Sequence, residues 1–210
     1  MTPPLPPLTA DSRFVDDLVP SPNVDTRAQG CQPCILVLHY TGLPTFERSI
    51  EVLSDPLCKV SCHYVVDLDG RTVQMVPEAV RAWHAGVSSW RGQTDLNSLS
   101  VGIEIQNVGH DAGYPDFPEA QMRAVERLAA DIVARHAIAT GNVVAHSDIA
   151  PSRKIDPGEK FDWQRLSRAG TGQESGQRKS DGQRAAAQRC KTKAIRPFTR
   201  AYYQLMHFGL

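Results

Sequence analysis

Three segments of the sequence place metal-binding side chains where an apolar stretch ends. His39 follows the apolar residues 35–38, His146 follows residues 143–145, and Asp156 lies in the polar segment beyond. A catalytic zinc site commonly takes three protein ligands from His, Asp, Glu or Cys and leaves a fourth position for water. Two histidines and one aspartate satisfy that count. A histidine at the end of a strand is also common as a structural residue, and the local H-E-x-x-H spacing of a helical zinc site is absent.

The elements that would position these side chains alternate between strands and helices. Apolar periodicity predicts strands at residues 35–39, 62–67, 72–76, 100–107 and 142–145, and helices at residues 45–53 and 118–141. The dipeptide Asp69-Gly70 favours a tight hairpin turn between the second and third of these strands. Residues 147–160 are rich in polar residues and proline, which predicts a loop. Strands interleaved with helices predict an α/β domain.

One acidic side chain lies on its own face of a predicted strand. In the segment SVGIEIQN, residues 101, 103 and 105 are apolar and share one face, so that Glu104 projects to the other face. Such a residue is either an exposed strand carboxylate or a functional group near the metal-binding side chains.

Composition excludes several classes of protein. Of the 210 residues, 41% are hydrophobic and 22% are charged, which excludes collagen-like, fully disordered and disulfide-scaffold chains. No apolar run approaches the ~18 residues that a membrane-spanning helix needs.

The whole chain is neutral, but residues 168–210 hold nine basic and two acidic side chains. A solvated tail is the ordinary explanation, and contact with an anionic polymer or with the acidic remainder of the chain is the alternative.

The chain divides into three predicted regions. Residues 1–34 contain seven of the fifteen prolines and no sustained periodicity, which is typical of an extended arm. Residues 35–167 carry the alternating elements and form the expected catalytic domain. Residues 168–210 form the basic tail, which we expect to be disordered because it contains few apolar side chains before residue 194.

Cysteine usage and the N-terminus bear on the compartment. The first residues lack the basic region and apolar segment of a secretory signal, which predicts a cytoplasmic protein; a different true N-terminus carrying a signal would predict a periplasmic or cell-envelope one. Five cysteines cannot all pair within one chain, which suits a reducing compartment. Cys31, Cys34, Cys58 and Cys62 could close a structural zinc site, form disulfides or remain buried thiols, and Cys190 stays unmatched in each scheme.

Five segments are similar to those of a known family. They are LVLHYTG at 36–42, SCHYVVDLDG at 61–70, VPEAVRAWHAG at 76–86, SVGIEIQN at 100–107 and VVAHSDIAPSRKIDPG at 143–158. The chain resembles a zinc-dependent N-acetylmuramoyl-L-alanine amidase of the type related to peptidoglycan recognition proteins. The resemblance covers residues 31–167 and implies a mixed β-sheet flanked by helices.

The resemblance also implies a role for individual residues. His39, His146 and Asp156 match the three ligands of one Zn²⁺ ion, Glu104 the acidic residue beside it, and Lys154 a nearby cation. Zinc would polarise the scissile carbonyl and lower the pKa of a water from ~15.7 to about 7. The glutamate would then accept that water's proton and return it to the leaving nitrogen, while the lysine would help to stabilise the oxyanion.

Other matched residues are less clearly catalytic. The resemblance places Trp83, His84 and Arg153 at the substrate groove, where the arginine suits a carboxylate and the indole suits a sugar face; Trp83 is equally compatible with the core. His63 lies inside a predicted strand, and we expect it to be a buried, hydrogen-bonded histidine.

The resemblance implies that longer relatives carry a peptidoglycan-binding helical module after the catalytic domain, and we expect residues 168–210 to be too short and too polar to form one. We expect a monomer that binds peptidoglycan or a muropeptide. The sequence does not distinguish intact muramyl chains from anhydro-muropeptides. The alternative is a non-catalytic module that binds muropeptide. Nucleic acid is not an expected partner, because the body of the chain has no basic segment interleaved with aromatic residues.

Overall fold

A six-stranded mixed sheet forms the centre of the computed structural model, which describes residues 6–172. The strand order is β1 (Asp17–Leu18), β5 (Thr72–Gln74), β4 (Tyr64–Val66), β7 (Ser100–Ile105), β3 (Ile35–Tyr40) and β8 (Val143–Ala145). Within this sheet β4 and β5 pair antiparallel, and the other neighbouring strands pair parallel. The predicted mixed sheet and its hairpin are therefore confirmed, with each hairpin strand three residues long.

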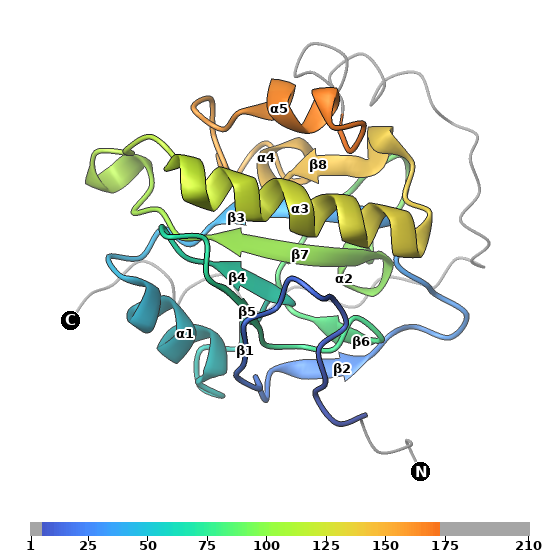
Figure 1. The fold of residues 1–210 in the computed structure, drawn as a ribbon. Helices are drawn as coiled ribbons and strands as arrows, with labels where there is room; N and C mark the ends of the chain where they lie inside the picture. The colour runs from blue at the N-terminus through green and yellow to red at the C-terminus, as the bar shows by residue number, and fades with distance from the viewer. Residues whose placement is uncertain (1–5, 173–210) are drawn as a thin grey trace.

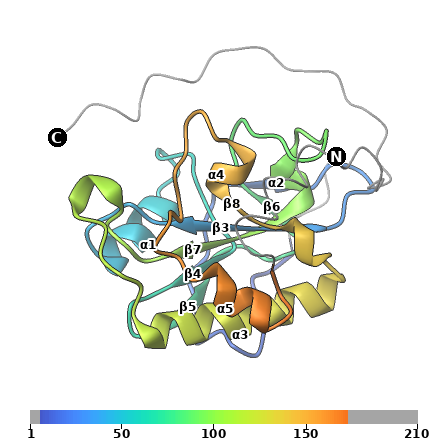
Figure 2. The ribbon, with the colours of Figure 1, turned by 90° about the horizontal axis from the view of Figure 1, so that it is seen from above.

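Helices cover both faces of the sheet (Figures 1 and 2). One face packs against α3 (Glu119–His136) and α5 (Trp163–Arg168) through apolar side chains such as Leu36, Ile103 and Leu128. The opposite face packs against α1 (Phe46–Ser54), α2 (Leu96–Leu99) and α4 (His146–Ile149). Short 3₁₀ turns lie at His110–Ala112 and Thr140–Asn142. None of the helices between residues 6 and 172 has the length and hydropathy to cross a membrane.

Two of the predicted elements differ in the structure, and helices α2 and α5 were not predicted. Helix α3 ends at His136 rather than near Gly141, because Ala137 adopts a left-handed conformation with φ 49°. The N–H of Ile138 then bonds to the carbonyl of Val133, which closes the helix and turns Ile138 into the core. The predicted loop at residues 147–160 begins inside a single helical turn, α4, whose N-terminus is capped by the Asp148 carboxylate.

The proline-rich arm lies extended against the domain. It supplies β1, which adds to the sheet beside β5, and β2 (Val24–Thr26), which pairs antiparallel with β6 (Val80–Ala82) in a separate two-stranded sheet. Most of the basic tail, residues 173–210, and the first five residues lie outside the described residues, so its expected disorder and the role of Cys190 stay predictions.

Candidate metal centre

The topology brings the metal-binding side chains to one edge of the sheet. Strands β7, β3 and β8 are parallel neighbours, so their carboxyl ends meet. His39 lies in β3 directly opposite Glu104 of β7, and His146 comes immediately after β8. Successive side chains of β3 and β7 point to opposite faces of the sheet, and His39 and Glu104 point to the face opposite α3.

Three ligand atoms converge at this edge. The Nδ1 atoms of His39 and His146 are 2.8 Å apart, and Oδ2 of Asp156 lies 3.2 Å from the first and 3.1 Å from the second. All three side chains are buried. Within residues 6–172, no other group of three or more His, Cys, Asp or Glu side chains is arranged to hold a metal ion. Cys31, Cys34, Cys58 and Cys62 do not gather into such a group, so the structure does not support the alternative four-thiolate site.

The protonation of these groups suits a cation. Burial, together with the neighbouring His146, lowers the pKa of His39 to about 4, so its ring is neutral at pH 7. Burial opposes ionisation of Asp156, but the adjacent imidazoles of His146 and His39 outweigh the effect of burial and hold the pKa of Asp156 well below its usual value. Two imidazole nitrogens and one carboxylate oxygen that face a common point form a donor set that Zn²⁺ accepts.

Two further groups lie beside the ligands. Glu104 is half-buried, and its Oε2 atom is buried without a hydrogen-bond partner among the described residues. Burial, and then the charge of Asp156, raises the pKa of Glu104 well above that of an ordinary glutamate. Lys154 is half-buried, and its charge acts on both Glu104 and His39. A strong carboxylate base and a cation therefore flank the ligand group.

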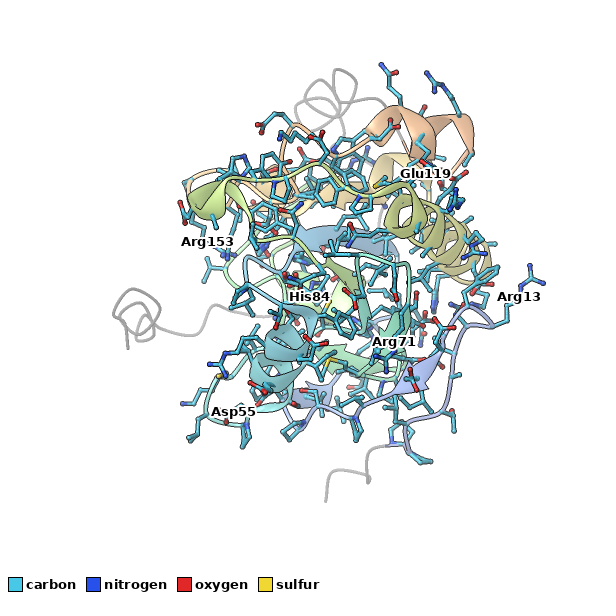
Figure 3. All side chains as sticks on the ribbon, turned by 60° about the vertical axis from the view of Figure 1, so that its left-hand side comes forward. Arg13, Asp55, Arg71, His84, Glu119 and Arg153 are labelled. Carbon is cyan, nitrogen blue, oxygen red and sulfur yellow. The ribbon has the colours of Figure 1, made fainter. Side chains whose placement is uncertain are left out.

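The three residues expected at the substrate groove have different surroundings. His84 is 6% exposed and lies behind His39, with its Nδ1 atom 3.0 Å from Nε2 of His39. Arg153 donates to the carbonyl oxygens of Val87 and Ala85 at the rim. In Figure 3 Arg153 lies near the outer margin of the molecule and His84 lies farther in.

Trp83, the third of these residues, is half-buried. Its indole N–H donates to Asp25 of the arm at 2.8 Å. Contact of Trp83, His84 or Arg153 with a substrate stays a prediction.

His63 is a buried structural residue, as predicted. It is completely buried, accepts a hydrogen bond from the Gly102 N–H at 3.0 Å and lies 3.1 Å from the Val80 carbonyl.

Sequence reasoning missed Ser100, whose hydroxyl lies 3.1 Å from Nε2 of His84. Its parity with Glu104 in SVGIEIQN places it on the same face, and that signal could have identified it.

Comparison with known proteins agrees with this geometry. A family model described as N-acetylmuramoyl-L-alanine amidase matches residues 29–159. The N-acetylmuramoyl-L-alanine amidase AmiD of Escherichia coli is 47% identical over 165 residues, which cover 71% of this chain and 59% of AmiD. The 1,6-anhydro-N-acetylmuramyl-L-alanine amidase AmpD of Citrobacter freundii is 36% identical, with 70% of this chain and 86% of AmpD covered.

A solved structure of E. coli AmiD in complex with the substrate anhydro-N-acetylmuramic acid-L-Ala-D-γ-Glu-L-Lys has a similar fold. The TM-score is 0.62 at 45% identity, and the match covers 70% of this chain and 61% of that one. The chain thus spans about three fifths of the length of AmiD and most of the length of AmpD. The extent of these matches shows that the chain belongs to the N-acetylmuramoyl-L-alanine amidase family.

Proposed function

We propose that the chain is a zinc-dependent amidase that hydrolyses the amide between the lactyl group of muramic acid and L-alanine. The observation that carries the proposal is the convergence of His39, His146 and Asp156 beside the Glu104 carboxylate. Muropeptides that end in anhydromuramic acid are the favoured substrate class, because the names of the relatives AmpD and AmiD and of the AmiD complex refer to such compounds or to this bond.

Each residue has a defined task in this reaction. Zn²⁺ bound by His39, His146 and Asp156 would supply Lewis acidity, polarising the amide carbonyl and making a water more acidic. Glu104 accepts one proton of that water as the water oxygen bonds to the carbonyl carbon. The same carboxyl then gives this proton to the nitrogen as the C–N bond breaks, which releases the free amine of L-alanine and the lactyl carboxylic acid. The acid keeps the second proton of the water until it ionises to the carboxylate in solvent. Lys154 donates to the oxygen that becomes negative during addition.

The environment of Glu104 suits this proton transfer. Oε2 of Glu104 accepts no hydrogen bond from residues 6–172, so its lone pairs stay available to the reacting water. Its raised pKa makes it a stronger base than an exposed glutamate. A structural carboxylate in the same place would instead be paired, as Glu78 is with Arg135 and His136 elsewhere in the domain.

Product analysis tests the proposal directly. The protein is incubated with anhydromuramyl-tripeptide, with chelator and then with added Zn²⁺, and the products are identified by mass spectrometry. We expect free tripeptide that disappears with chelator and returns with zinc. His39→Ala and Asp156→Ala should abolish turnover while the fold is retained. Asp131→Ala, which removes a half-buried carboxylate of α3 on the opposite side of the sheet, should leave turnover unchanged.

Two results would overturn the proposal. Turnover that survives in His39→Ala or Asp156→Ala would exclude the ligand assignment. A zinc-loaded protein that cleaves neither this tripeptide nor intact sacculi would instead be a muropeptide-binding module. A comparison of the two substrates also decides between anhydro-muropeptides and intact wall. The cytoplasmic location and the monomeric state stay predictions.

A further inference from the structure

A buried chain of hydrogen bonds leads from a backbone carbonyl to one of the ligand histidines. The Ser100 hydroxyl donates to the carbonyl oxygen of Leu96 at 2.5 Å, and the same hydroxyl lies 3.1 Å from Nε2 of His84. Nδ1 of His84 lies 3.0 Å from Nε2 of His39. His39, His84 and Ser100 are exposed by 6% or less, so water does not replace these partners.

The direction of every bond in this chain follows from its carbonyl end. A carbonyl oxygen can only accept, so the hydroxyl proton of Ser100 is committed to Leu96. The oxygen of Ser100 therefore accepts from Nε2–H of His84. A neutral imidazole carries one N–H, which leaves Nδ1 of His84 as an acceptor for Nε2–H of His39. The proton of His39 is thus held on Nε2, and its Nδ1 lone pair faces His146 and Asp156.

We propose that His84 and Ser100 are positioning residues that fix the tautomer and ring orientation of His39 for metal binding. This role rests on the metal centre of the proposed function and differs from the substrate contact that the sequence suggested for His84. A ligand histidine commonly gives its second N–H to a carboxylate, a carbonyl or a water. In this chain a second histidine takes that place, and the Leu96 carbonyl sets its tautomer.

The surrounding fold is built to hold His84 in this position. The side-chain oxygen of Asn97 accepts from the backbone N–H groups of His84 and Ala85, at 3.1 and 2.8 Å. A Cβ atom at Gly102 would lie 2.7 Å from Nδ1 of His84, so the glycine in β7 provides the space for the ring. The carbonyl of Ala85 lies 3.3 Å from Nε2 of His146. Residues 84 and 85 therefore contact both imidazole rings at their Nε2 atoms, on the side away from the metal centre.

Zinc affinity and histidine tautomers test this role independently of catalysis. His84→Leu removes the acceptor, whereas His84→Gln keeps an acceptor for His39 and a donor for Ser100. We expect zinc affinity, measured by competition with a chromophoric chelator, to fall about 10- to 100-fold in the leucine variant. The glutamine variant should stay close to wild type. Ser100→Ala should weaken zinc binding in the same direction. Ser49→Ala, which removes a buried hydroxyl that bonds to the Thr45 carbonyl and to Gln106, should not.

Long-range ¹H–¹⁵N NMR of the wild type reads the tautomers directly. We expect Nε2–H for both His39 and His84. A wild-type spectrum with the proton on Nδ1 of His39 would overturn the proposal even if His84→Leu fails to fold. A folded His84→Leu variant that binds zinc as tightly as wild type would overturn it too.

The outcome is separable from that of the proposed function. A wild type that binds zinc and cleaves nothing would refute the amidase and leave the positioning role standing. A wild type that binds no zinc would refute both.

Discussion

Replacement of Glu104 by glutamine is expected to separate activity from stability. The substitution keeps the shape of the side chain and removes its basicity, so proton transfer to and from the reacting water is lost. General acid–base catalysis contributes about 10²- to 10⁴-fold, which corresponds to about 3 to 5 kcal/mol of the barrier. We expect kcat for anhydromuramyl-tripeptide to fall by that factor while KM and zinc affinity stay near wild type.

The structure predicts that the same variant is at least as stable as wild type. Oε2 of Glu104 accepts no hydrogen bond within residues 6–172, so the amide loses none there. A buried charge without a partner costs about 1 kcal/mol or more, and each kcal/mol recovered should raise Tm by about 2 to 4 °C in a chain of this size.

The raised pKa of Glu104 also determines how the stability difference between wild type and Glu104→Gln changes with pH. Because the pKa of Glu104 is raised in the folded state, the metal-free wild type should lose stability relative to Glu104→Gln as pH rises above 4.5. Thermal unfolding in chelator at several pH values measures this difference. A variant with kcat within about tenfold of wild type would exclude the base role, given its expected size. A lower Tm would show that the carboxylate is structurally paired.

Three further outcomes are expected. Lys154→Met should lower kcat by about 10²- to 10³-fold without weakening zinc binding, because the ammonium would stabilise the oxyanion and Lys154 is not one of the three proposed ligands. Steady-state kinetics and chelator competition check both parts. Zinc should raise the free energy of unfolding by mass action, by about 4 kcal/mol at a free zinc concentration 1,000 times its dissociation constant, and so raise Tm. His39→Ala should abolish that Tm shift in a thermal melt. Glu78→Gln should destabilise the domain by about 3 to 5 kcal/mol in urea unfolding, because Arg135, His136 and Tyr64 all bond to this buried carboxylate. Burial opposes ionisation of Glu78 but these bonds hold its pKa below the usual value, so this stabilisation is present above pH 4.5 and lost as pH falls.

Much of the fold could be predicted because its signals are local. The alternation in SVGIEIQN gave the strand β7 and the face of Glu104, and Asp69-Gly70 gave the hairpin between β4 and β5. The end of α3 was harder, because it depends on a left-handed Ala137 that no residue preference marks. The arm's short strands were also missed, since β1 and β2 are stabilised by the edges that they pair with rather than by their own pattern.

The site could be predicted as a set of residue types but not as a network. Strand ends and the family resemblance identified the candidate ligands, whereas the hydrogen-bond partner of each one depends on packing between segments far apart in the chain. His84 illustrates the difference. Its segment suggested a substrate contact, but Asn97 and Gly102 place its ring behind His39. No spacing within the sequence encodes that approach.

The parity of a single strand connects the separate parts of the site. Ser100, Gly102 and Glu104 point to the same face of β7, where they anchor the hydrogen-bond chain, make room for His84 and carry the proposed base, respectively. The register that sets His39 opposite Glu104 brings all three tasks to one ligand. A shift of one residue between β3 and β7 would turn Ser100 and Glu104 toward the core under α3 and turn the apolar residues toward the metal centre. The apolar packing of residues 101, 103 and 105 against α3 therefore fixes the geometry of the metal centre as well as the stability of the sheet.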